Sequence, residues 1–173
     1  MTHDDAHETV RGWFTGRLPQ EWFTGPVEIT IDREEILIVG PLATPETGEG
    51  VSDAERSAAV DGRIKAFRED TRDRRIGIAR EAEHRFGRKV AWGVDCDGRR
   101  ALFTHLSVPV MTRLRQPERR VLDTLVDAGV ARSRSEALSW AVKLVGEHTE
   151  SWLADLRTAM EEVDKLRAEG PEL

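Results

Sequence analysis

The sequence has very little of what secreted, membrane-spanning or disulfide-bonded proteins require. Its 173 residues contain one cysteine, Cys96, so no disulfide can form within the chain, which is typical of a reducing compartment. No apolar run approaches the roughly 18 residues of a membrane-spanning helix. The N-terminus lacks the basic and apolar regions of a signal peptide. These absences predict a soluble, cytoplasmic protein without a membrane partner.

Residues for catalysis or cofactor binding are also scarce. No C-x-x-C pair and no Gly-rich phosphate-binding loop occurs. No metal-ligand spacing connects Cys96 with the five histidines, which are His3, His7, His84, His105 and His148. We therefore expect no enzymatic activity, no metal site and no cofactor, unless an active site is assembled from residues scattered along the chain.

Charge is distributed unevenly along the chain, whose net charge is −6. Residues 63–100 carry 12 basic and 7 acidic side chains, and residues 101–146 carry 7 and 4, whereas residues 1–62 and 147–173 are acidic. A local basic face can bind phosphate even when the total charge is negative. The charge pattern therefore leaves nucleic acid open as a partner.

Residues 1–106 are predicted to form a small α+β domain of unknown role. Asp97-Gly98 lies between two strand-like runs, and this dipeptide favours a hairpin because both turn positions need a positive φ. A capping residue at Ser52 or Asp53 predicts the start of one long helix that ends before Gly87. The expected elements are a helix at 3–16, a hairpin of strands 27–31 and 36–39, a long helix at 53–86, and a hairpin of strands 90–96 and 100–106.

Two features of this domain admit both a structural and a functional interpretation. The tetrapeptide Trp-Phe-Thr-Gly occurs at Trp13–Gly16 and at Trp22–Gly25. Aromatic anchors that cover a sheet are the main interpretation, and an exposed partner site is the alternative. The long helix is rich in Arg and Glu, which is typical of a solvated face with ion pairs, and nucleic-acid contact is the alternative.

The pattern changes after residue 106 and predicts a short strand. Apolar or small side chains alternate with a second set, so the strand would have one face for burial and one that carries arginines. Pro109 cannot donate a hydrogen bond, which favours a strand start or a sheet edge. The first set is Val108, Val110, Thr112 and Leu114, and the second is Pro109, Met111, Arg113 and Arg115.

Two short helices are predicted after this strand. Gln116-Pro117-Glu118 has proline and an acidic group where helices begin, and Gly129 is a typical helix end. Ser133 and Glu136 have the spacing of a capping box, which predicts the start of the second helix. The apolar stripes are Val121, Leu122, Leu125 and Val126 in the first helix and Leu138, Ala141, Val142 and Val145 in the second.

Residues 108–148 resemble the ribbon-helix-helix family of the MetJ/Arc type. The resemblance rests on Val110-Met111-Thr112-Arg113-Leu114, on Val121-Leu122-x-x-Leu125, and on the run from Gly129 to Leu138 that ends in Ser-Arg-Ser-Glu-Ala-Leu. It implies that two protomers pair their strands into an antiparallel ribbon that enters the DNA major groove. The implied base-reading residues are Met111, Arg113 and Arg115, and the implied phosphate-binding residues are Arg132, Ser133, Arg134 and Ser135.

Two other structures remain open for the two helices. A helix-turn-helix also joins two helices through a glycine-containing turn. Ser135 stands where that motif normally buries an apolar residue, and Leu125 stands where it favours a small one. A structural helical hairpin without a nucleic-acid role is the other alternative.

The last segment, residues 151–173, is predicted to be an acidic helical extension of the 107–150 module. Apolar or small residues recur at alternating spacings of four and three, which resembles about three heptads of a coiled coil. The segment either packs back on the N-terminal part or extends the second helix and enlarges the dimer. The repeating positions are Val145, Thr149, Trp152, Leu156, Ala159, Val163 and Leu166.

These features predict a homodimeric, sequence-specific DNA-binding protein of the bacterial nucleoid, either a transcriptional regulator or a chromosome-associated factor. The expected partners are double-stranded DNA, a second copy of the chain, and a protein that binds the N-terminal domain or the acidic C-terminal helix. The alternative is a protein-interaction or antitoxin-like protein that uses the two helices only to dimerise. Arg113 and Arg115 favour DNA, whereas Pro109 and Met111 favour a protein contact.

Overall fold

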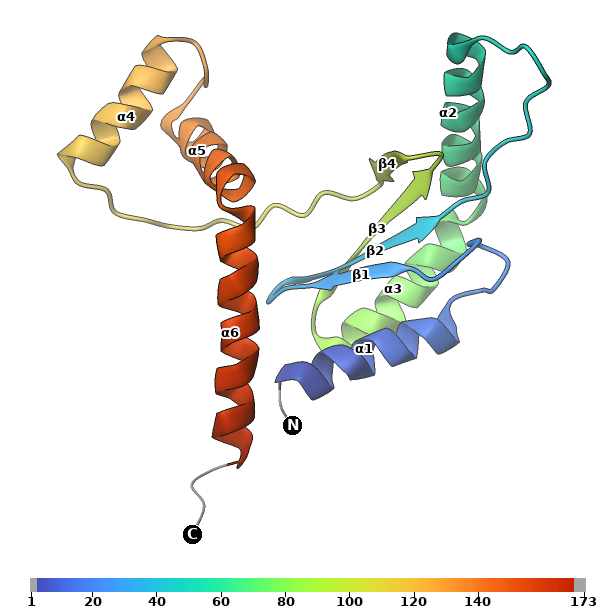
Figure 1. Cartoon of the computed structure of the whole chain (residues 1–173), viewed down its shortest axis with the longest axis horizontal. Coiled ribbons are helices and arrows are strands. Elements are labelled where there is room, and N and C mark those ends of the chain that lie inside the picture. Colours follow the sequence, from blue (N-terminus) through green and yellow to red (C-terminus); the bar gives the residue numbers. More distant parts are fainter. Residues whose placement is uncertain (1–2, 170–173) are drawn as a thin grey trace. The chain divides into compact units, whose positions relative to one another are not determined.

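The structure, a computed structural model, describes residues 3–169 and divides into two compact units (Figure 1). The first unit is His3–Val108, and the second begins at Pro109. Strands occur in the first unit and the second is helical, so the protein is of the α+β class. Within the described range, no helix is both long and apolar enough to cross a membrane.

The N-terminal unit is built on a four-stranded sheet of order β1-β2-β3-β4. The two outer pairs are antiparallel, and both predicted hairpins are confirmed. Asp97 and Gly98 have φ values of 54° and 75°, as the second turn requires. The central strands β2 and β3 pair in parallel, with Ile36 opposite Val90. The strands are β1 (Glu28–Ile31), β2 (Glu35–Pro41), β3 (Lys89–Cys96) and β4 (Arg99–Leu102).

The crossover between β2 and β3 consists of two helices, so the prediction of one long helix at 53–86 is wrong. Helix α2 (Asp53–Asp70) ends at Thr71, and α3 (Arg72–Phe86) follows directly. One straight helix of this length would extend about 50 Å, whereas an eight-residue strand spans about 26 Å. The break lets both helices pack on the short sheet.

Arg75 stabilises the corner between α2 and α3 through hydrogen bonds. Its Nε donates to the Thr71 hydroxyl at 3.0 Å, and its Nη2 donates to the Arg68 carbonyl at 2.7 Å. The guanidinium also lies 4.9 Å from the ring centroid of Phe103. Arg75 is 7% exposed, and burial lowers its pKa. The side chain therefore holds the end of α2, where free carbonyls carry partial negative charge, against the sheet.

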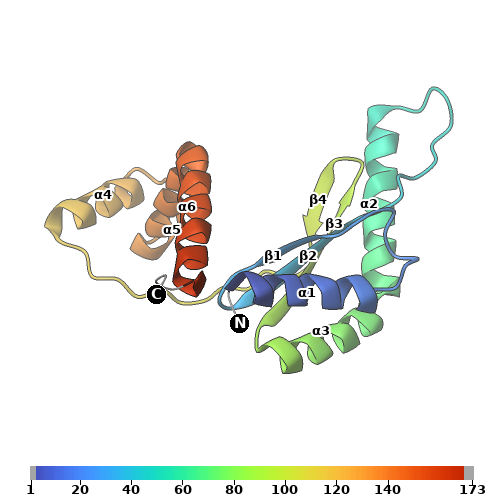
Figure 2. The same cartoon turned by 60° about the horizontal axis from the view of Figure 1, so that its bottom comes forward.

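The core of this unit lies on one face of the sheet, where Figure 2 shows α1 (His3–Arg17) and α3. Every second residue of β2 and of β3 packs against these helices. Phe14 and Trp22, one from each repeated tetrapeptide, are buried, which confirms the expectation that these segments anchor the sheet. The core residues are Val10, Phe14, Trp22, Ile36, Ile38, Ile78, Ala82, Val90 and Trp92.

The C-terminal unit contains three helices, α4 (Gln116–Asp127), α5 (Arg134–His148) and α6 (Glu150–Glu169). The predicted starts at Pro117 and Ser133 and the left-handed glycine after α4, Gly129 with φ 74°, are confirmed. The single chain has no strand at 108–115, contrary to the prediction, because no neighbouring strand pairs with this extended segment. The small core is Leu122, Ala131 and Ala137, packed against Leu114, Leu125, Val126 and Leu138.

Gly40 on β2 is needed because an aromatic ring lies directly on its Cα. A Cβ at this position would be 2.2 Å from the Phe23 ring. We expect Gly40→Ala to lower the free energy of unfolding by about 1–3 kcal/mol through overpacking. Gly62 in α2 is the matched control because a Cβ there meets nothing within 4 Å, so Gly62→Ala should stabilise the protein by about 0.5–1 kcal/mol. Urea titrations of both variants measure this, and equal effects would contradict the packing.

Arg75→Ala should destabilise the N-terminal unit because it leaves the Arg68 carbonyl and the Thr71 hydroxyl without their donor. The expected loss in the free energy of unfolding is about 1–3 kcal/mol. Arg72→Ala is the control, since the Arg72 side chain is 70% exposed, and should change it by less than about 0.5 kcal/mol. Thermal melts compare the two variants. Similar melting temperatures would mean that Arg75 does not hold the corner.

Candidate nucleic-acid interface

The start of α5 is closed by a capping arrangement. The Ser133 hydroxyl accepts a hydrogen bond from the Glu136 N–H at 3.2 Å. The Glu136 carboxylate accepts one from the Arg132 N–H at 2.7 Å, one residue earlier than in the usual capping box. The N–H groups of Arg134 and Ser135 have no hydrogen bond within residues 3–169. These two amides form the free N-terminal end of the helix, where an anion is favoured.

Arg134 is held in place by a carboxylate on the preceding helix. Its Nε and Nη2 donate to the two carboxylate oxygens of Asp123 at 2.7 and 2.9 Å. This bidentate bond holds the pKa of Asp123 below its ordinary value and raises the pKa of Arg134. Nη1 of Arg134 makes no hydrogen bond to any described residue. The ion pair therefore joins α4 to α5 and orients a guanidinium that keeps donors for a phosphate.

The segment before α4 places the predicted base-reading residues at the surface. Leu114 packs on the small core of the unit, while Arg113 and Arg115 are exposed. Arg119 donates to the Leu114 carbonyl at 2.7 Å and fixes the junction with α4. Met111 is 94% exposed. The expected alternation of faces is thus present at 113–115.

The alternation is not complete in the single chain. Of the set that was expected to be buried, Val108, Val110 and Thr112 are exposed, Val110 to 88%, and Leu114 alone is half-buried. The backbone of Val110 and that of its neighbours make no ladder in the described chain. Val110 would be covered only if another strand or helix face lay on this segment.

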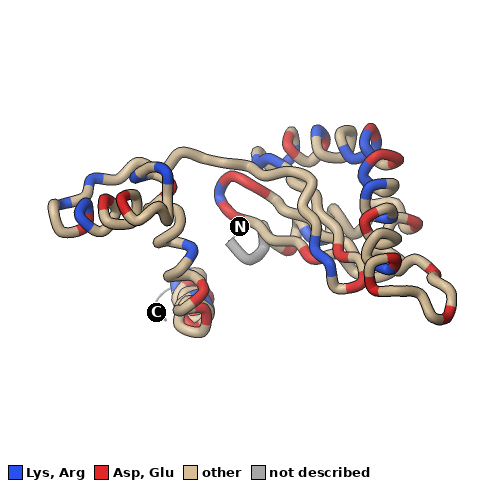
Figure 3. Tube along the Cα trace, turned by 90° about the horizontal axis from the view of Figure 1, so that it is seen from above, with Lys and Arg blue, Asp and Glu red and all other residues tan. Residues whose placement is uncertain are grey.

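Several arginines of this unit have no acidic partner. Within residues 3–169, no ion pair involves Arg113, Arg115, Arg120 or Arg132, and Figure 3 shows the Lys and Arg positions along the chain. Some arginines of the N-terminal unit join one element to another, as in the pairs Arg17–Glu81, Arg74–Glu21 and Arg100–Glu28, and others there also lack an ion pair among the described residues. The unpaired guanidiniums leave positive charge at the start of α4 and of α5.

The structure adds three residues to the candidate site that the sequence interpretation did not name. Arg120 contributes an unpaired charge on α4, Arg119 fixes the segment before α4, and Asp123 orients Arg134. The exposed basic pair Arg119-Arg120 was a visible signal. The Asp123–Arg134 pair had none, because its partners lie on different helices and 11 residues apart.

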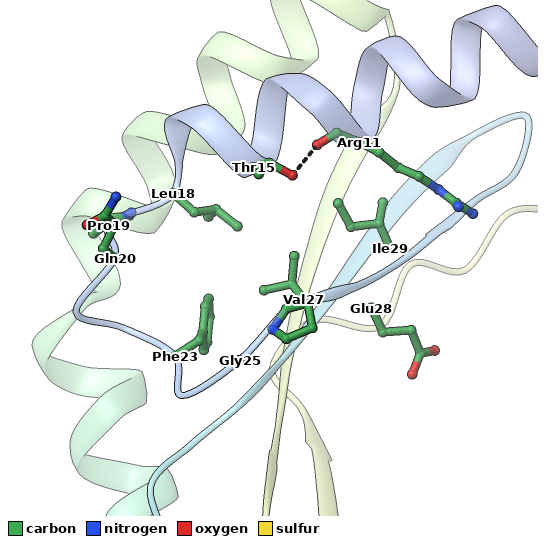
Figure 4. A pocket seen from close by; sticks show the side chains of 11 residues that line it. Arg11, Thr15, Leu18, Pro19, Gln20, Phe23, Gly25, Val27, Glu28 and Ile29 are labelled. Carbon is green, nitrogen blue, oxygen red and sulfur yellow. Dashed lines mark hydrogen bonds between the residues drawn. The ribbon is translucent and has the colours of Figure 1, made fainter.

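The N-terminal unit has a groove of about 490 Å³ between α1 and β1 (Figure 4). Its lining is mainly apolar, and Phe23 and Val27 point into it. Glu28 at its edge is bonded to both Nη atoms of Arg100 at 2.9 and 3.0 Å, which lowers the pKa of Glu28. Within the described residues, no group of three or more His, Cys, Asp or Glu side chains is placed to hold a metal ion.

Comparison with known proteins divides the chain at nearly the same place. Residues 8–102 match the model of the Rv1265-like protein, N-terminal domain, and residues 115–167 match the Mb1296 C-terminal domain. Mb1296 from Mycobacterium bovis and Rv1265 from Mycobacterium tuberculosis are each 62% identical over 161 residues, which cover 93% of this chain and 70% of the relative. Neither name states an activity. No solved structure matches the chain. The chain belongs to the family of Rv1265-like proteins.

Proposed function

We propose that this protein is a homodimeric DNA-binding regulator whose C-terminal unit pairs with a second copy as a ribbon-helix-helix. One observation carries the proposal. An extended, arginine-bearing segment without a strand partner leads into two helices joined at Gly129, and the second helix is capped by Ser133. The descriptions of the matching families name no DNA-binding motif, so the proposal rests on the residues of this chain.

The dimer follows from what the C-terminal unit leaves uncovered. Its core contains three buried side chains, too few to stabilise helices of this length alone. Large apolar side chains on α4 and α5 are exposed, among them Val121, Trp140, Val142 and Val145. A second copy would supply a strand for residues 108–115 and an apolar face for these side chains.

The DNA contact follows from the charges on the outer face of the ribbon. A two-stranded ribbon fits the major groove, where an arginine fork can bond guanine O6 and N7. Arg113 and Arg115 project from the segment without a carboxylate partner, and Met111 offers an apolar contact for a thymine methyl. Phosphates would be held by Arg132, Arg134 and the free amides at the start of α5, with Ser133 and Ser135 beside them.

A protein-interaction or antitoxin-like role is the second candidate. It is favoured by Val110 and Met111, adjacent side chains that are 88% and 94% exposed and that would suit an apolar partner surface. Selection of bound duplexes from a random DNA library by the full chain separates the two. Recovery of one enriched sequence supports DNA binding. Recovery of unenriched DNA at low salt alone would favour the interaction role.

Arg113→Ala should weaken binding to the selected sequence by about 1–3 kcal/mol for each lost contact, because the bidentate bond to guanine disappears. Both protomers carry the change, so the dimer should lose about twice that. Binding to a scrambled duplex should fall much less. The measurement is a fluorescence titration of both duplexes at fixed salt. Arg157→Ala on α6 is the control with equal loss of charge. If Arg113→Ala discriminated between the two duplexes as well as the wild type, the ribbon would not be the part that contacts the DNA bases.

Arg132→Ala and Arg134→Ala should each weaken binding to all duplexes alike, because phosphate contacts carry no sequence information. Each should reduce the slope of log affinity against log salt by roughly one per lost contact. Asp123→Asn is the informative companion because it releases Arg134 without removing it. It should retain the salt slope. A loss confined to one DNA sequence would make Arg132 or Arg134 a base reader and contradict this assignment.

A further inference from the structure

Helix α6 has an apolar face that its own unit leaves uncovered. Trp152 and Leu166 are 59% and 67% exposed, and no residue of α6 is buried. None of its side chains belongs to the small core of α4 and α5. The exposed large apolar residues of this helix are Trp152, Leu156, Met160, Val163 and Leu166.

The N-terminal unit exposes few large apolar side chains, and it has the mainly apolar groove between α1 and β1. Among its described residues, the exposed large apolar side chains are Leu106 and Val108, both in the segment that leads out of the unit. The core side chains of that unit are already enclosed by its own helices and sheet. A second α6 offers an apolar stripe of the same length and period as this face.

The stripe has the heptad period of a coiled coil. Thr149, Leu156 and Val163 fall at one core position, and Trp152, Ala159 and Leu166 fall at the other. Thr149 separates α5 from α6, and its hydroxyl bonds the Val145 carbonyl at 2.6 Å. The helix that carries the repeat therefore starts anew at Glu150 and does not continue α5.

The residues that flank the heptad core favour one orientation, parallel or antiparallel, for two paired α6 helices. One flank, the g positions, holds Asp155, Glu162 and Glu169 in α6, and the other, the e positions, holds Leu153, Met160 and Arg167. In an antiparallel pair the g positions face each other, so carboxylates would meet carboxylates. In a parallel pair each g position faces the e position five residues on, which brings Glu162 to Arg167 of the second copy and leaves Asp155 beside an apolar side chain. In the single chain Glu162 bonds Lys165 at 2.9 Å and Arg167 bonds Asp164 at 3.5 Å, and these exposed pairs would exchange or share their partners in the coil.

We propose that α6 forms a parallel, two-stranded coiled coil with the α6 of a second copy of this chain. The coil joins protomers at a surface separate from the ribbon, and it requires no DNA. Its core consists of the heptad residues within α6, namely Trp152, Leu156, Ala159, Val163 and Leu166, and the two symmetric Glu162–Arg167 contacts set the direction. The assignment of direction therefore holds or fails independently of the DNA-binding role.

Cysteine cross-linking of the full chain tests the direction. Leu156 and Leu166 are separated by ten residues, about 15 Å along a helix, and a disulfide requires Cα atoms within about 7 Å. In a parallel coil each meets its own counterpart, so Leu156→Cys and Leu166→Cys should both give covalent dimers on mild oxidation. In an antiparallel pair at most one can do so. Thr158→Cys, on the outer face, and the wild type, whose Cys96 is buried, are the controls.

A charge exchange tests the same contact without changing the core. Arg167→Glu should raise the dimer dissociation constant about fivefold or more, because four carboxylates then meet across the pair. Adding Glu162→Arg should restore it, and Glu161→Lys, at an outward position, should leave it nearly unchanged. Sedimentation equilibrium gives the constants. Cross-links at both sites with restoration support the parallel coil. A cross-link at one site only, none at either, or no restoration would overturn it.

Discussion

The C-terminal unit cannot enclose its own apolar surface, and both the proposed dimer and the proposed DNA contact depend on this constraint. Its buried core is Leu122, Ala131 and Ala137, while apolar side chains of the 108–115 segment, α5 and α6 lie exposed. Burial of apolar area stabilises by roughly 25 cal/mol per Å², so this uncovered surface is a large reserve that a second copy can use. In the proposed dimer a second strand would pair with the extended segment, and the arginines between its apolar residues would gain a fixed geometry.

The N-terminal unit has the opposite character. Its parallel central pair β2–β3 is covered by α1, α2 and α3, and its glycines and aromatic rings fit closely, as at Gly40 and Phe23. Several of its arginines are used internally, with Arg75 holding a helix corner and Arg100 bonded to Glu28. Basic composition alone is therefore a weak guide to phosphate binding. Arg33, Arg56, Arg63, Arg80 and Arg88 of this unit also lack an ion pair within residues 3–169, so an unpaired guanidinium alone does not mark a DNA contact. What distinguishes the C-terminal unit is the extended segment that carries Arg113 and Arg115 into two helices joined at Gly129.

Local chemistry made much of the fold predictable. The Asp97-Gly98 turn, the Ser133 cap and Gly129 after α4 each depend on neighbouring residues, and all were found from the sequence. The break at Thr71 was not predictable, because Arg75 at this corner contacts Phe103, which is distant in the sequence, and because the length of the sheet limits the helix. The local sequence is rich in Arg and Glu and favours one continuous helix. The parallel pairing of β2 with β3 and the bond from Arg134 to Asp123 join separate elements in the same way. For the candidate site, the sequence indicated Arg113, Arg132 and Arg134, but it did not indicate Arg120 or the bond between Arg134 and Asp123.

Hydrogen exchange along residues 108–115 tests most directly whether this segment pairs with the same segment of a second copy. In an antiparallel ribbon, alternate amides of this segment donate to the second strand, whereas in the single chain they have no partner. Exchange should therefore be slow at alternate positions from Val110 to Arg115 when the protein is dimeric, and should become fast on dilution to monomer. Fast exchange throughout this segment in a protein that sediments as a dimer would contradict the ribbon and leave the dimer to other surfaces.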